Sequence, residues 1–134
     1  MLVRRPPFRR AGAFEDLTGF RPEIDWLPDL DIYETEAEFI LIVSLPGVSS
    51  QDLEVAVRGR SLTVSGRRVM TLPREVTVHL VESQGGRFER RIGVPPDADL
   101  SQIRTTIGDG QLVIRLPRRV SREIEITLEG SAGS

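Results

Sequence analysis

Hydrophobic and polar positions alternate through the middle of the chain. Leu53, Val55 and Val57, for example, alternate with polar or small residues, which is the period-two pattern of a half-buried strand. No long helical period interrupts these segments, so the pattern predicts an all-β fold, an antiparallel β-sandwich. The predicted strands cover residues 29–34, 39–45, 53–57, 62–66, 76–80, 88–94, 103–107 and 112–116.

Turn-forming residues separate the predicted strands. Arg58-Gly59-Arg60 is a tight connection that predicts a hairpin, and Gly108-Asp109-Gly110 supplies a second one. Pro46-Gly47 and Pro95-Pro96 each end an apolar strand. Short strands joined in this way favour antiparallel neighbours.

The sequence divides into an N-terminal arm (1–27), a sandwich domain (28–118) and a C-terminal tail (119–134). The arm is proline-broken, and only residues 13–20 could form a short helix. We expect an arm that either docks on a protein surface or stays mobile and adhesive. Four of the chain's seven aromatic side chains lie in it: Phe8, Phe14, Phe20 and Trp26.

The tail combines a flexible Gly/Ser end with one apolar segment. Ile124 and Ile126 point to one side of an extended segment, and glutamates point to the other. This segment could be the last strand of its own domain, but the arginine-rich linker before it favours docking on another chain.

The amino-acid composition excludes several classes of function. The chain has 134 residues, a net charge of -2 and no cysteine, and all 18 basic residues are arginine. Without lysine there is no P-loop and no Schiff-base chemistry. The near-neutral charge gives no general attraction to nucleic acid or membranes. No apolar run approaches the ~20 residues that span a bilayer, and no signal peptide is apparent, so we expect a cytoplasmic protein without a membrane span.

Candidate catalytic groups are few. His79 is the only histidine and sits in an alternating segment, so we expect a strand-surface residue rather than a catalytic base. The carboxylate pairs at 97–99 and 29–31 lack the other ligands of a calcium loop. We therefore predict no catalytic residue, no metal and no cofactor, and a protein that is not an enzyme.

Taken in order, the motifs of the chain resemble those of the small heat shock proteins, the Hsp20 family built on the α-crystallin domain. The arginine, glutamine and threonine at 118, 111 and 105 depart from the lysine, valine and alanine that are usual there. The matching segments are Pro28-Asp29-Leu30-Asp31-Ile32-Tyr33-Glu34, Leu45-Pro46-Gly47-Val48, Leu62-Thr63-Val64-Ser65-Gly66, Phe88-Glu89-Arg90-Arg91-Ile92-Gly93-Val94-Pro95, Gly110-Gln111-Leu112, Leu116-Pro117 and Ile124-Glu125-Ile126.

The resemblance implies a stress-response chaperone, a holdase that needs no ATP and binds partly unfolded client proteins. The four aromatics of the arm, Phe8, Phe14, Phe20 and Trp26, are then predicted to bind these clients. It also implies an immunoglobulin-like sandwich that dimerises and then forms larger homo-oligomers. Ile124 and Ile126 would anchor the tail in an apolar groove of another chain. The candidate groove walls are Leu53, Val55, Val57, Ile103 and Ile107.

The resemblance places Arg90 at a dimer contact, where Glu75 or Glu82 of the partner's loop would pair with it. Residues 68–84 are predicted to project as a loop whose internal strand pairs with the 29–34 edge of a neighbouring chain. The apolar residues of that strand are Val76, Val78 and Leu80.

Two other functions stay open at this point. One is a sandwich co-chaperone or adaptor, monomeric or dimeric, that binds a single folded partner. The other is a nucleic-acid or membrane-surface protein that acts through the arginines of the arm, although acidic residues there offset the basic charge. The arm's aromatics could equally pack inside the oligomer.

Overall fold

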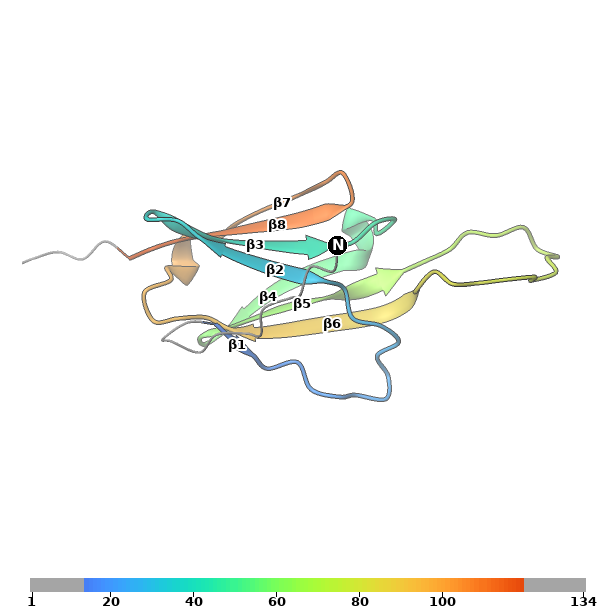
Figure 1. Ribbon diagram of the computed structural model, residues 1–134, viewed down its shortest axis with the longest axis horizontal. Coiled ribbons are helices and arrows are strands. Elements are labelled where there is room, and N and C mark those ends of the chain that lie inside the picture. Colours follow the sequence, from blue (N-terminus) through green and yellow to red (C-terminus); the bar gives the residue numbers. More distant parts are fainter. Residues whose placement is uncertain (1–13, 120–134) are drawn as a thin grey trace, which may run out of the picture.

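The alternating segments form two four-stranded antiparallel sheets that pack face to face in a computed structural model, which describes residues 14–119 (Figure 1). One sheet has the order β1-β6-β5-β4 and the other the order β2-β3-β8-β7. The strands are β1 (Glu15–Asp16), β2 (Leu30–Glu34), β3 (Glu38–Ser44), β4 (Leu53–Arg58), β5 (Ser61–Arg68), β6 (Gly86–Gly93), β7 (Arg104–Gly108) and β8 (Gln111–Pro117), with short 3-10 helices η1 (Ser50–Asp52) and η2 (Leu100–Gln102).

The core lies between the two sheets and is built from their inward-facing side chains. Strand β3 alternates half-buried and buried residues along its whole length, because its inner side chains reach the core while its outer ones cover the sheet. Its neighbour β8 adds apolar residues to the same inner face, and strands β5 and β6 of the other sheet supply the opposing ones. Among the largest fully buried side chains are Phe88, Leu41, Leu45, Leu62, Ile92, Ile114 and Leu116.

Both predicted hairpins are present. The β7–β8 loop is Asp109-Gly110, and both residues have positive φ (52° and 74°), which is the conformation that a tight hairpin of twisted strands requires. Gly59, with φ 56°, plays the same part between β4 and β5. The all-β antiparallel sandwich is thereby confirmed.

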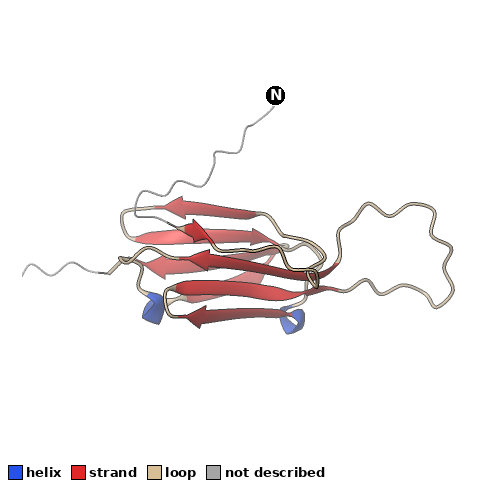
Figure 2. Ribbon diagram, turned by 90° about the horizontal axis from the view of Figure 1, so that it is seen from below, coloured by secondary structure: helices blue, strands red, loops and turns tan. Residues whose placement is uncertain are grey.

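Two segments differ in the single chain from the elements that their sequences suggest. Residues 76–80 belong to a long exposed loop between β5 and β6 and form no strand in the single chain (Figure 2). A strand needs a neighbour for its backbone groups, and none lies beside this segment. At the N-terminal side, within the stretch that could form a short helix, residues 15–16 form β1 against β6.

Candidate interaction surfaces

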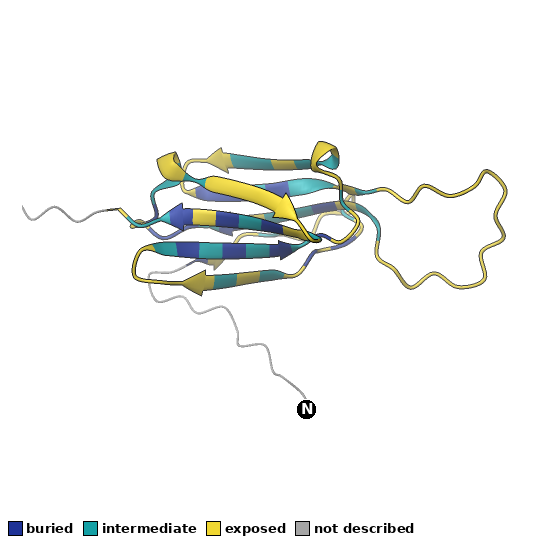
Figure 3. Ribbon diagram, turned by 90° about the horizontal axis from the view of Figure 1, so that it is seen from above, coloured by how far each residue is buried: buried dark blue, intermediate teal, exposed yellow. Residues whose placement is uncertain are grey.

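An open apolar edge lies between β4 and β7. These are the last strands of their sheets, each follows a 3-10 turn, and they run along the same side of the sandwich (Figure 3). Val55 and Val57 are paired with inward-facing residues of β5, and Ile107 is paired with buried Leu112 of β8. Cross-strand partners point to the same face, so these side chains face the gap between the sheets.

The predicted groove residues gather along this edge. Leu53, Val55 and Ile103 pack against the core while remaining partly accessible. Val57 is 43% exposed and Ile107 is 38% exposed, because no element of residues 14–119 covers them. The structure thus brings the five residues to one side of the sandwich, and their role as walls of a groove for a tail stays a prediction.

The loop between β5 and β6 projects well beyond the sandwich (Figure 1). Val76, Val78 and Leu80 are 46%, 62% and 76% exposed. The base of the loop is held by Arg68, whose Nη1 donates to the backbone oxygen of Gln84 at 2.9 Å. Four further apolar side chains of this loop are exposed. They were not singled out from the sequence because they lie outside the alternating segment 76–80: Val69, Met70, Leu72 and Val81.

Strand β2 has a free edge, to which the loop of a partner chain is predicted to pair. Strand β2 is the outer strand of its sheet among the described residues, and Tyr33 on it is 54% exposed. An unpaired edge of this kind is a template for another strand. Pairing of β2 with a partner's loop remains a prediction.

Residues 14–27 are docked on the sandwich. After β1 pairs with β6, the backbone N–H of Leu17 donates to Arg91 O at 2.8 Å. Nine residues further on, Trp26 forms a bridge with Phe88 and donates its indole N–H to Gly86 O at 3.1 Å.

Docking buries two of the aromatics that were predicted to bind clients. Phe14 is 5% exposed and meets the ring of Phe39 edge-on at 5.2 Å, and Trp26 is 9% exposed and packs in the same way on Phe88. They are core residues because the edge of β6 pairs with the segment that carries them. Phe20, by contrast, is 95% exposed. Phe8 lies outside the described residues, as do Ile124 and Ile126.

Phe20 sits on an arch between the two docked ends. The arch spans the outer face of the β4–β5–β6 sheet and leaves open hollows of about 780 and 600 Å³, both lined largely by charged and hydroxyl side chains. Next to Phe20, Arg21 is ion-paired with Glu89 of β6 and with Glu23 at 2.9 Å. The pair with Glu89 joins the arch to the sheet, while the aromatic ring of Phe20 stays in solvent.

Arg90 is engaged inside its own chain. Its Nη1 donates to Pro28 O at 3.0 Å, and its Nη2 lies 3.4 Å from Asp16 Oδ2. The side chain is 12% exposed, and its Nε is buried without a partner among the described residues. Within the single chain Asp16, brought in by the docking of β1 along β6, is the carboxylate nearest Arg90, and pairing with Glu75 or Glu82 of a partner stays a prediction.

The carboxylates at 97–99 serve local structure. Asp97 pairs with Arg118, and Asp99 accepts hydrogen bonds from Ser101 N at 3.1 Å and Ser101 Oγ at 2.5 Å. The hydrogen bond from the Ser101 side chain lowers the pKa of Asp99 below its ordinary value of 3.8. His79 lies in the exposed loop and not on a strand.

Residues 14–119 hold no group of three or more side chains suited to a metal ion. No helix in this part of the chain has the length and apolar character needed to cross a membrane.

A sandwich of this topology, with an open apolar edge and a projecting loop, is the architecture of an α-crystallin domain. The sequence profile of the Hsp20/alpha crystallin family matches residues 31–129, so the chain belongs to this family of small heat shock chaperones.

Curated relatives carry matching names. Small heat shock protein C4 of Rickettsia felis is 31% identical over 69% of this chain, and the 16.9 kDa class I heat shock protein 1 of Triticum aestivum is 28% identical over 90% of it. The matched region spans 57% of the Rickettsia protein and 77% of the wheat protein. It spans 56% of spore protein SP21 of Stigmatella aurantiaca and 23% of a Dictyostelium discoideum heat shock protein, so several relatives are much longer than the shared domain.

Solved structures agree on the fold. The small heat-shock protein from Xylella fastidiosa, described as having a distinct high order structure, superposes with a TM-score of 0.72 at 29% identity and covers 80% of this chain and 99% of its own. Heat shock protein 16.0 from Schizosaccharomyces pombe gives 0.69 at 28% identity, covering 83% and 82%.

Proposed function

We propose that the protein is an ATP-independent holdase that binds partly unfolded proteins and prevents their aggregation in the cytoplasm. The observation that carries this proposal is the amount of apolar surface that the sandwich leaves uncovered. The edge between β4 and β7, the β5–β6 loop and Phe20 are all exposed in the single chain. Contiguous exposed apolar surface marks a site of interaction with another protein.

Client capture needs only burial of apolar surface. Burying one large apolar side chain stabilises a complex by about 1.5–3 kcal/mol, so a few such contacts offset the ordering of a flexible client segment. Phe20 is the arm aromatic best placed for this among the described residues. Phe14 and Trp26 could contact a client only after residues 14–27 leave the sandwich.

Assembly uses the remaining surfaces. The β5–β6 loop pairs with β2 of a second chain to make a dimer, and Ile124 and Ile126 of the tail fill the β4–β7 edge of another dimer. One tail contact is weak, because ordering each flexible residue costs about 1–2 kcal/mol of backbone entropy. Many tails in one closed particle act together through effective concentration. The result is a stable homo-oligomer whose subunits still exchange.

The direct test is suppression of heat-induced aggregation of a thermolabile enzyme such as citrate synthase, followed by light scattering. The protein in molar excess should lower scattering equally with and without ATP. Phe20→Ala should weaken suppression, whereas Glu36→Ala, a change at an exposed turn residue with no apolar contact to offer, should not. Unchanged scattering at every ratio of protein to client would show that the holdase proposal is wrong.

The same preparation separates the holdase from an adaptor that binds one folded partner. An adaptor would run as a monomer or dimer in size-exclusion chromatography with light scattering and would leave client aggregation unchanged. A holdase of the proposed kind has the mass of a larger homo-oligomer.

A further inference from the structure

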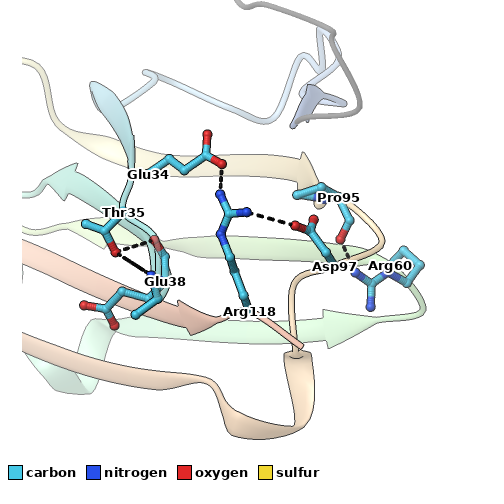
Figure 4. A network of polar contacts seen from close by, with 8 residues as sticks. Glu34, Thr35, Glu38, Arg60, Pro95, Asp97 and Arg118 are labelled. Atoms are coloured by element: carbon cyan, nitrogen blue, oxygen red, sulfur yellow. Dashed lines mark hydrogen bonds and ion pairs between the residues drawn. The ribbon is translucent and has the colours of Figure 1, made fainter. Parts of the chain in front are cut away.

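The last described residues of the chain meet a polar junction at one end of the sandwich. Arg118 follows the final residue of β8 and stands where the motif that the chain resembles has a lysine. Its guanidinium lies between two carboxylates from different parts of the fold (Figure 4). One is Glu34 at the end of β2, and the other is Asp97 in the β6–β7 connection, with Nη1 to Oδ2 at 3.4 Å.

An aromatic ring also contacts the guanidinium. The Cζ atom of Arg118 lies 4.7 Å above the centre of the Phe39 ring, a cation–π contact. Phe39 is 4% exposed and also meets the ring of Phe14 edge-on, so it belongs to the packed core. The Nε of Arg118 is buried and has no hydrogen-bond partner in the described part of the chain, while the side chain as a whole is 28% exposed.

The backbone around Arg118 is held from two sides. Its N–H donates to Ala37 O at 3.0 Å, and the next residue, Arg119, donates to Asp97 O at 2.7 Å. Arg118 also forms an antiparallel bridge with Ala98. Backbone and side chain together set the direction in which the chain leaves the sandwich.

We propose that Arg118 is a positioning residue that fixes the exit of the C-terminal tail and ties it to β2, the edge at which a partner chain would pair. This inference rests on the proposed role of Ile124 and Ile126 as anchors. The segment between Arg119 and Ile124 is short, so the direction at Arg118 limits which neighbouring groove the two isoleucines can reach. Lysine, a point charge on a flexible stem, lacks the planar fork of donors with which arginine contacts two carboxylates and an aromatic ring at once.

The test compares Arg118→Lys with Arg115→Lys in the full-length chain. Arg115 is on the same strand but forms a single ion pair with Glu38 on an exposed face, so it is a matched control. Subunit exchange is measured by native mass spectrometry after mixing isotope-labelled and unlabelled oligomers. We expect exchange about five- to tenfold faster for Arg118→Lys, from the loss of one charge-assisted contact, and within about twofold of the wild type for Arg115→Lys.

A second variant at the same junction controls for misfolding of Arg118→Lys. Glu34→Gln changes only an exposed side chain of the junction, and it should accelerate exchange in the same direction by a smaller factor. Thermal unfolding followed by circular dichroism should show an intact sandwich for each variant. An exchange rate equal to that of the wild type in both Arg118→Lys and Glu34→Gln would overturn the proposal.

A double-mutant comparison distinguishes tail positioning from a general effect on the sandwich. Ile124→Ala with Ile126→Ala should by itself lower the oligomer mass, and adding Arg118→Lys to it should change nothing further, because no anchored tail is left to position. If the isoleucine variant keeps the wild-type mass, tail anchoring fails and the inference fails with it. If Arg118→Lys weakens assembly equally in both backgrounds, tail anchoring stands but the positioning role is wrong.

Discussion

Two phenylalanines six positions apart in one segment should respond in opposite ways to truncation. Phe14 is 5% exposed and packs edge-on against Phe39, whereas Phe20 is 95% exposed on the arch. Both belong to the group of aromatics that the sequence alone assigned to client binding. Phe14→Ala and Phe20→Ala therefore remove the same number of atoms from two environments that differ only in burial.

The expected magnitudes follow from that burial. Truncating a buried phenylalanine costs about 3–5 kcal/mol, and the lower end applies to Phe14 because it lies at the margin of the core. Truncating an exposed side chain changes stability by less than about 0.5 kcal/mol. With a urea m-value of about 1–3 kcal/mol/M for a small domain, a loss of ~3 kcal/mol lowers the urea midpoint by about 1–3 M.

The fluorescence of Trp26 provides the assay. It is the only tryptophan of the chain and is buried on Phe88 within the same docked segment, so its fluorescence reports whether this segment is seated. Far-ultraviolet circular dichroism reports the sheets in the same titration. Protein concentration must be held constant, because assembly shifts apparent stability by mass action. A midpoint for Phe14→Ala within about 0.5 M of the wild type, or an equal loss in Phe20→Ala, would refute the assignment of Phe14 to the core.

Two further predictions concern the loop and the carboxylates. Deleting residues 74–82 removes the exposed Val76, Val78 and Leu80 and should convert the protein to monomers that keep the sandwich; dimers that persist in light scattering would show that the loop is not the dimer contact. Asp99 has a lowered pKa in the fold, so its hydrogen bonds to Ser101 stabilise the protein above pH 3.8, and this contribution is lost as the pH falls through the lowered value. Asp99→Asn should therefore flatten the acid limb of the thermal midpoint against pH, and a limb as steep as that of the wild type would exclude this role.

The fold could be predicted from the sequence because its signals are local. Alternation over 53–57 and 112–116 and the glycines at 59 and 110 specify strands and turns before any tertiary contact forms. The order of the motifs identified the family, and the profile match over residues 31–129 confirmed it.

The predicted sites were only partly recoverable from the sequence. Leu53, Val55 and Val57 share the inner face of β4 because period-two alternation fixes which side chains point inward. Val76, Val78 and Leu80 alternate equally well, yet they form no strand in the single chain, since a strand pattern does not supply the neighbour it needs. Their pairing with another chain remains a prediction.

What only the tertiary structure decided is how the ends of the domain are attached. Composition describes 14–27 as an aromatic arm, but the edge of β6 binds this segment and divides its aromatics into buried Phe14 and Trp26 and exposed Phe20. In the same way, Arg90 and Arg118 are ordinary arginines in the sequence. Each acquires a role from carboxylates and carbonyls that are more than twenty residues away along the chain or on another strand. Local patterns determine strands because a strand's face is set by its own residues, whereas partners across the fold are chosen by packing that no single segment encodes.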